Sequence, residues 1–147
     1  MQRVLRAAVD VAGERIGEIG KGLCVFVGVA FDDGAGDAHA LADRLVDLRI
    51  FEDAAGRMNL SVADARGELL VVSQFTLMAD TRRGRRPSFT GAAPPALAEP
   101  LVARLVERVR ARDVAVAQGR FGAHMEVALT NDGPVTFVLD TRERRSG

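Results

Sequence analysis

Residues 23–31 read Leu-Cys-Val-Phe-Val-Gly-Val-Ala-Phe, and this apolar run decides the fold. Its length and its three valines favour a β-strand that is buried on both faces, as a strand at the centre of a sheet is. A polar loop with two glycines follows at 32–37. Leucines then repeat at spacings of four and three within 38–51, which predicts an amphipathic helix. The pair indicates a strand–helix unit of the kind found in α/β proteins.

The segments on either side extend this unit to a mixed sheet. Before it, strands at 4–12 and 15–19 meet at Gly13 and predict a hairpin. Further along the chain, apolar runs predict four more strands, at 69–77, 114–117, 125–130 and 135–140. The sequence therefore predicts an α/β fold with layered mixed β-sheets of about seven strands and two main helices packed outside.

The second helix is predicted at 96–112, where apolar residues recur every four positions. Pro100 does not suit a helix interior, so we expect regular helix only from about that residue. The segment 51–59 is predicted to be a turn. Residues 79–95 form a long loop without periodicity, and loops of this length in compact domains are usually functional or disordered. The charged tail, 141–147, is expected to be frayed.

The composition is that of a soluble globular protein. Of 147 residues, 48% are hydrophobic and 27% are charged, so we expect a single domain over residues 1–147 and exclude disordered, collagen-like and disulfide-scaffold chains. Twenty basic and twenty acidic residues cancel, which argues against a surface that is basic all over but allows a local basic patch. No apolar run is long enough to span a membrane and no signal peptide is visible, so a cytoplasmic protein is expected.

Familiar catalytic motifs are absent from the sequence. No nucleophile elbow, phosphate-binding P-loop or zinc-protease motif occurs in it. His39 and His124 are far apart and lack neighbouring ligand residues, so surface or structural roles are expected for both. The one cysteine, Cys24, cannot build a zinc site and is expected to be inert packing. The sequence therefore predicts no metal site.

The predicted strand at 69–77 ends in Ser-Gln-Phe-Thr-Leu beside the long loop. Strand ends next to loops are places where binding and catalytic groups gather. Alternation along a strand puts Ser73 and Phe75 on one face, and Gln74 and Thr76 on the other. Two interpretations stay open: a functional site, or polar side chains that simply meet water. Thr76 as a nucleophile would need a base close by, and the local sequence supplies none.

Residues 81–87 hold four arginines within five positions. The planar guanidinium group matches phosphate oxygens with two parallel hydrogen bonds, so a phosphate-binding loop is one interpretation. A solvated charged loop is the other, and closeness to the polar strand end favours the first. A second basic cluster in the tail is expected to be solvated. The arginines of the loop are Arg82, Arg83, Arg85 and Arg86, and those of the tail are Arg142, Arg144 and Arg145.

Residues 131–136 read Asn-Asp-Gly-Pro-Val-Thr and join the last two predicted strands. Asparagine, aspartate, glycine and proline all favour turns, so a hairpin turn is the simpler interpretation. The alternative is a cis bond between Gly133 and Pro134, which is uncommon among bonds that precede proline. Such a bond would turn backbone carbonyl groups in an unusual direction.

Together, the motifs at 73–77 and 131–136 resemble the signature pair of the D-aminoacyl-tRNA deacylases. The resemblance covers nearly the whole chain, and two long motifs in the right order make it specific. Further matching stretches are Gln2–Val4, Gly17–Gly20, Arg49–Phe51, Met58–Asn59, Asp80–Arg82, Arg86–Phe89 and Gly119–Gly122.

This resemblance implies a proofreading hydrolase. The family cleaves the ester between a D-amino acid and the terminal adenosine of tRNA, and it also clears glycine from mischarged tRNA, as on tRNA(Ala). It implies a homodimer with an α/β fold, an RNA substrate, no DNA or membrane partner, no metal and no cofactor. Catalysis assisted by the 2′-hydroxyl of the tRNA is implied, with backbone N–H groups stabilising the oxyanion.

The resemblance also assigns roles to residues. It implies that Gly133 and Pro134 form a cis-proline turn that enters the active site of the other subunit, where its carbonyl groups bind the substrate's α-amino group and exclude an L side chain. The residues implied to line the opposing pocket are Ser73, Gln74, Phe75 and Thr76, with Phe75 helping to seat the terminal adenosine. The residues implied to contact tRNA phosphates are Arg82, Arg83, Arg85 and Arg86.

Two other functions remain to be distinguished. A non-catalytic RNA-binding module would use the arginine loop and would bind RNA without hydrolysing an ester. An editing domain that works in cis beside a synthetase is disfavoured, because the 147 residues show no linker or second domain. The C-terminal extension, 142–147, looks longer than is typical of the family, and neither motif is affected by it.

Overall fold

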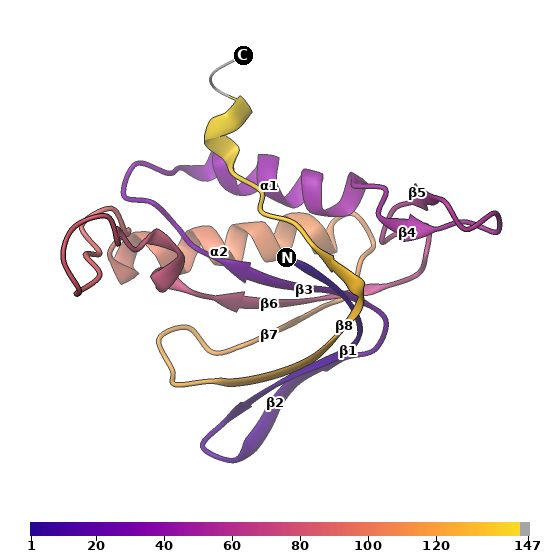
Figure 1. Ribbon diagram of the computed structural model, residues 1–147, viewed down its shortest axis with the longest axis horizontal. Coiled ribbons are helices and arrows are strands. Elements are labelled where there is room, and N and C mark those ends of the chain that lie inside the picture. Colours follow the sequence, from indigo (N-terminus) through magenta and orange to yellow (C-terminus); the bar gives the residue numbers. More distant parts are fainter. Residues whose placement is uncertain (145–147) are drawn as a thin grey trace.

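A curved mixed sheet lies beneath two helices in the computed structural model, which describes residues 1–144 (Figure 1). Both helices cover the same face of the sheet, and the long strands curl away beneath it. The elements are β1 (Gln2–Val11), β2 (Glu14–Ile19), β3 (Gly22–Val27), α1 (Ala35–Asp47), β4 (Phe51–Glu52), β5 (Met58–Leu60), β6 (Glu68–Ser73), the 3-10 helix η1 (Phe75–Met78), α2 (Pro95–Arg110), β7 (Val116–Gln118), β8 (Glu126–Thr136) and the 3-10 helix η2 (Thr141–Arg144).

The sheet is organised around β1 and β3. The strand order is β2-β1-β3-β6-β7, and β8 pairs with the other edge of β1. All pairs that include β1 are antiparallel, whereas β3–β6 and β6–β7 are parallel. The first half of β1 pairs with β3 and its second half with β2, and a register shift between Val9 and Asp10 interrupts the pairing with β2. The predicted mixed α/β architecture with two helices outside is confirmed.

Alternate residues of β3 and β6 fill two separate cores. Leu23, Val25 and Val71 face the helices and pack against α1 and α2. Cys24 and Leu70 face the other way, into a second core that is enclosed by β1, β2 and β8. The prediction of a strand buried on both faces is therefore confirmed for β3, and Cys24 is buried as expected.

Several predicted boundaries were wrong. The helix predicted at 38–51 begins at Ala35, because the carboxylate of Asp37 accepts the Gly34 N–H at 2.9 Å, and it ends at Asp47. The expected turn at 51–59 is instead the β4–β5 hairpin, in which buried Phe51 pairs with Leu60. The structure thus holds eight strands within the described residues rather than about seven.

Pro100 lies inside α2, which begins at Pro95, so the expected late start was wrong. The missing N–H of Pro100 leaves the carbonyl of Ala96 without its intrahelical donor. Both residues are exposed, so water replaces that donor and the helix continues. The buried face of α2 still repeats as predicted, with Leu101, Leu105 and Val109 in the core.

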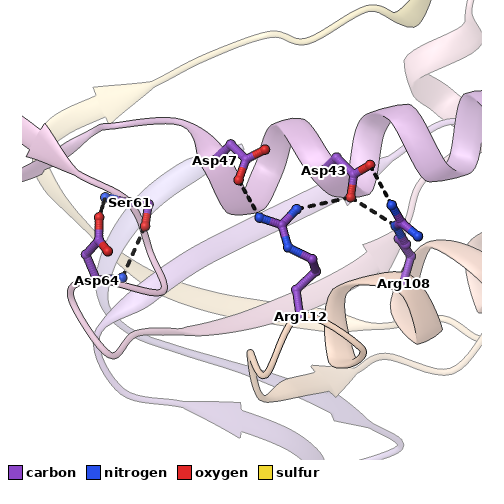
Figure 2. A network of polar contacts seen from close by, with 6 residues as sticks. All are labelled: Asp43, Asp47, Ser61, Asp64, Arg108 and Arg112. Atoms are coloured by element: carbon purple, nitrogen blue, oxygen red, sulfur yellow. Dashed lines mark hydrogen bonds and ion pairs between the residues drawn. The ribbon is translucent and has the colours of Figure 1, made fainter.

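An ion-pair network joins the two helices at the surface (Figure 2). The carboxylate of Asp43 on α1 accepts hydrogen bonds from Arg108 at 3.0 and 3.1 Å and from Arg112 at 3.2 Å. Arg112 also pairs with Asp47 at 2.5 Å. The two guanidinium groups hold the pKa of Asp43 below its usual range. Nearby, the Ser61 and Asp64 side chains each accept the other's backbone N–H, which fixes the turn after β5.

The C-terminal segment continues into a short helix within the described residues. The tail forms η2 up to Arg144, and Arg142 pairs with Asp32 at 3.1 Å, so the expectation that this arginine is simply solvated was wrong. Arg145, of the same predicted cluster, lies outside the described residues. Across residues 1–144, neither α1 nor α2 has the length and apolar character that crossing a bilayer demands.

Candidate functional site

The strand β6 ends at Ser73, and the chain then turns into η1. The Gln74 N–H donates to the carbonyl of Val27 at 2.7 Å, which completes the pairing of β6 with β3. The next residues form η1, which packs closely against the end of β3: a Cβ atom on Gly28 would lie 2.7 Å from the Met78 side chain. The predicted strand at 69–77 was therefore too long, and its strict alternation of faces does not continue beyond Ser73.

The side chains at this strand end are unequally exposed. Ser73 and Gln74 are half-buried, whereas Thr76 is exposed and Phe75 is 61% exposed. The ring of Phe75 meets that of Phe89 edge to face, with centroids 5.0 Å apart. Across residues 1–144, the Thr76 hydroxyl forms no hydrogen bond with a histidine or a carboxylate. The geometry does not activate Thr76 as a nucleophile in the way a catalytic triad does.

The motif at 131–136 is a bulge inside one continuous strand, not a turn between two. Val4 of β1 pairs with Asn131, and Gln2 pairs with Thr136. Arg3 alone therefore stands opposite the four residues 132–135, which must leave the plane of the sheet. The prediction of a hairpin turn between strands at 125–130 and 135–140 was wrong: one strand, β8, runs from Glu126 to Thr136, and residues 137–140 are not a strand.

Side-chain hydrogen bonds fix the shape of the bulge. The amide oxygen of Asn131 accepts the Val135 N–H at 3.0 Å, and its NH₂ group donates to the Thr136 hydroxyl at 3.0 Å. The bond between Gly133 and Pro134 is cis, and Gly133 has a φ of +131°. Gly133 and Pro134 are both exposed at the crest of the bulge. The hydrogen bonds of Asn131 thus hold this dipeptide at the surface of the molecule.

Arg3 supports the bulge from below. The side chain is 6% exposed, and its Nη1 donates to the Ile50 carbonyl at 2.8 Å. Its Nε donates to the Asp132 carbonyl at 3.3 Å and lies 3.4 Å from the Asp132 carboxylate. Its Nη2 lies 3.9 Å from the Glu52 carboxylate, so a buried guanidinium with four polar partners holds the backbone just before Gly133.

A cavity of about 410 Å³ opens beside η1 and the end of β8. Gln74, Leu77 and Met78 line one side, and the segment 136–142 lines the other. Gly133 and Pro134 do not line it. Within one chain, Gln74 and Thr136 line the same cavity, whereas the Gly133–Pro134 dipeptide is exposed outside it.

The arginine loop, residues 80–88, lies at one end of the molecule, between η1 and α2 (Figure 1). Asp80 and Ser88 close its base through two mutual backbone hydrogen bonds of 2.7 and 2.9 Å. All residues from 81 to 90 are exposed. The loop follows η1 directly, so the four predicted arginines lie at the end of the molecule that also carries Phe75. The predicted arginines are Arg82, Arg83, Arg85 and Arg86.

Within the part of the chain that the structure describes, the remaining ionisable groups do not gather into a further catalytic set. His39 and His124 are both exposed. Among residues 1–144, no three histidine, cysteine or acidic side chains gather in a metal-binding arrangement. Burial raises the pKa of the Cys24 thiol to about 11, so this thiol is neutral at physiological pH.

Comparison with known proteins shows which family the chain matches. The family model described as D-Tyr-tRNA(Tyr) deacylase matches residues 1–140. The chain belongs to this family. Its deacylase relatives include a protein of Chloroflexus aurantiacus named D-aminoacyl-tRNA deacylase, 56% identical over 99% of this chain and 91% of the relative. A protein of the same name from Herpetosiphon aurantiacus is 53% identical over 100% of this chain and 96% of the relative.

Solved structures share the deacylase fold. A structure of a protein named c-Myc DNA Unwinding Element Binding Protein is 39% identical, with a TM-score of 0.89 over 95% of both chains. A structure described as a probable eukaryotic D-amino acid tRNA deacylase has a TM-score of 0.79 over 90% of this chain and 92% of that one. At 18% identity, the second likeness concerns the fold alone.

Sequence reasoning missed two residues of this candidate site, Arg3 and Phe89. Arg3 lies inside an apolar strand, and an arginine in such a position is a signal of a buried polar contact. Phe89 gives no such signal, because only the tertiary structure brings its ring against that of Phe75.

Proposed function

We propose that this chain hydrolyses the ester bond of D-aminoacyl-tRNA, releasing the D-amino acid and the tRNA. The observation that carries the proposal is the bulge at 131–136, whose backbone is fixed by Arg3 and Asn131 and whose crest is exposed. The names of relatives more than 50% identical over nearly the whole chain support the same activity.

Chirality is set by the crest of the bulge. Carbonyl groups of Gly133 and Pro134 bind the α-amino group of the aminoacyl ester and occupy the space of an L side chain, so the L ester is excluded by collision. Glycine has no side chain to exclude, so glycyl-tRNA mischarged on tRNA(Ala) is also a substrate. The outward direction of this dipeptide, away from its own cavity, supports its entry into the site of a second subunit.

A homodimer follows from this arrangement, because each site is completed by the other copy. Exposed apolar side chains near the cavity support it: Leu77 is 51% exposed and Val138 is 90% exposed. We place the protein in the cytoplasm, where its tRNA substrate is found. Sedimentation of the protein at micromolar concentration tests the dimer, and a monomer would contradict the shared site.

Bond cleavage uses the substrate's own hydroxyl group. The 2′-hydroxyl of the terminal adenosine assists attack on the ester carbonyl, and the N–H groups of Phe75 and Thr76 stabilise the oxyanion. As the first N–H groups of η1, they have no acceptor within that helix. Such a donor is worth about 2.7–4 kcal/mol to the transition state. Thr76→Ala is therefore expected to keep most of the activity, and complete loss with an intact fold would make Thr76 a catalytic residue.

The first experiment measures deacylation of D-tyrosyl-tRNA and L-tyrosyl-tRNA by the purified protein in the presence of EDTA. Loss of the D ester alone is expected, with no need for a metal. Gly133→Ala is expected to lower kcat/KM for the D ester by about 100-fold, because an added Cβ atom would lie 2.7 Å from the Val135 side chain and shift the bulge. The control is Gly56→Ala, which has a similarly positive φ of +77° but open space around the added atom.

The second candidate function is nucleic-acid binding without hydrolysis. The arginine loop favours it, and so does the name of the 39% identical relative of known structure, which is that of a DNA-element binding protein. Under this hypothesis RNA or DNA binds tightly, neither ester is cleaved, and Gly133→Ala changes nothing. Cleavage of the D ester alone would reject it.

A further inference from the structure

The crest of the bulge lies against a buried positive charge. The guanidinium group of Arg3 is almost wholly buried, and a Cβ atom on Gly133 would lie 3.5 Å from its Nη2. Under the proposed function, this crest binds the substrate's α-amino group, which is a cation when it is protonated. Two positive charges then approach each other across Gly133, and their repulsion opposes binding unless nearby anions outweigh it.

Two carboxylates offset the charge of Arg3. An oxygen of Asp132 lies 3.4 Å from its Nε, and an oxygen of Glu52 lies 3.9 Å from its Nη2. One positive and two negative charges leave one negative charge in excess beside the crest. Asp132 alone would only neutralise the guanidinium group. Glu52 therefore supplies the excess negative charge, from the strand β4 and not from the bulge itself.

The backbone of Glu52 is fixed on both sides. Before it, the side chain of Phe51 is buried in the core beneath the helices. After it, the carboxylate of Asp53 closes the β4–β5 hairpin by accepting the N–H groups of Ala55 and Arg57, at 2.9 and 3.0 Å. The Glu52 side chain is 59% exposed, so its charge acts on solvent next to the crest as well as on Arg3. The fold thus holds an anion at the rim of the crest.

We propose that Glu52 is a positioning residue whose carboxylate offsets Arg3, so that the crest prefers a protonated α-amino group to a neutral α-hydroxyl group. The substrate class is then a D-aminoacyl ester with a free amine, and the corresponding α-hydroxy ester is disfavoured. Glu52 acts through Arg3 and does not touch the substrate. The role of the crest rests on the proposed function, and separate assays of binding and cleavage distinguish the two.

The test uses two esters on the same tRNA, one of D-tyrosine and one of its α-hydroxy analogue. The ratio of their kcat/KM values reports only on the amine, because every contact made by the tRNA cancels. E52Q is expected to lower this ratio about three- to fivefold, which is the scale of one partly exposed ion pair. The change is expected in KM and not in kcat, since the ammonium charge is present in both the ground state and the transition state.

Matched variants separate charge from structure. E52D keeps the charge and is expected to retain most of the preference. E14Q removes an exposed carboxylate at the far end of β1, where Val11 pairs with Glu14, and is expected to leave the ratio unchanged. Raising the salt from about 0.1 to about 0.5 M is expected to narrow the difference between the wild type and E52Q, because exposed charges are screened.

Three results would overturn the role of Glu52. An unchanged ratio in E52Q would show that its charge does not reach the amine. An equal loss for both esters would show that Glu52 only supports the fold of the bulge. The same change of ratio in E14Q would show that the effect comes from the net charge of the protein.

A binding assay makes the test independent of cleavage. The probes are two adenosine amides in which N–H replaces the ester oxygen, one carrying D-tyrosine and one its α-hydroxy analogue, and calorimetry measures their affinities. The wild type is expected to bind the amine probe more tightly, and E52Q to narrow the difference about three- to fivefold. If the wild type cleaves neither ester but shows this dependence on Glu52, the proposed function fails and the role of Glu52 stands. If D-tyrosyl-tRNA is cleaved and both ratios ignore Glu52, this role fails alone.

Discussion

Replacing Arg3 with methionine tests how the bulge is held. The substitution keeps an unbranched chain in the buried space but removes every donor. The lost contact with the Ile50 carbonyl, at 2.8 Å, is a hydrogen bond from a charged group, worth about 1.5–3 kcal/mol. The 3.4 Å ion pair with the Asp132 carboxylate adds little, because that carboxylate is 36% exposed and water replaces the guanidinium there. The expected loss in the free energy of unfolding is about 2–3 kcal/mol.

Urea unfolding followed by circular dichroism measures this loss, and an unchanged m value confirms that the native state is still compact. The matched control is Arg6→Met on the same strand, since Arg6 is exposed and has no ion pair within residues 1–144. Deacylation is expected to fall further than stability explains, because the carbonyl of Asp132, next to Gly133, is no longer held. If Arg3→Met and Arg6→Met unfold at the same urea concentration, the reasoning about Arg3 is wrong.

Three other predictions concern stability. Gly22→Ala places a Cβ atom 1.8 Å from the Glu68 carbonyl, so a loss of about 3 kcal/mol or more is expected in chemical unfolding; Gly20→Ala, with open space, is the control. Burial raises the pKa of the Cys24 thiol from 9.0 to about 11, so the stability that the neutral thiol contributes is complete below pH 9 and is lost between pH 9 and 11. Cys24→Ala is expected to remove this loss from a plot of the free energy of unfolding against pH. Asp43→Asn is expected to cost about 0.5–1 kcal/mol, and less in 1 M salt, in thermal unfolding.

The sheet and its helices were predictable because their signals are local. An unbroken apolar run with two valines at 23–27 favours a buried strand, and leucines at helical spacing favour α1 and α2. Boundaries were less predictable. Propensity extends the strand through Phe75 and Thr76, yet the chain turns into η1 because Met78 packs on the bare backbone at Gly28.

In the candidate site, too, the residue types were predictable and their arrangement was not. The polar stretch 73–76, the arginine-rich loop and the turn-forming motif at 131–136 are visible in the sequence as residue types out of keeping with their neighbours. Their arrangement is not visible. Four turn-forming residues between two apolar runs read as a hairpin, and only the pairing of Val4 with Asn131 and Gln2 with Thr136 shows a bulge.

By itself, the sequence determined the fold class, the residue types of the site and, through two motifs, the family. The tertiary structure decided which side chains contact one another. Arg3 bonds to Asp132, the ring of Phe75 meets that of Phe89, and the carboxylate of Asp80 pairs with Arg82 and not with another arginine of the loop. The physical reason is the distance along the sequence over which each signal acts. Hydrophobic periodicity is written into consecutive residues, whereas a guanidinium group has several possible acceptors, and the packing of distant strands and loops selects among them.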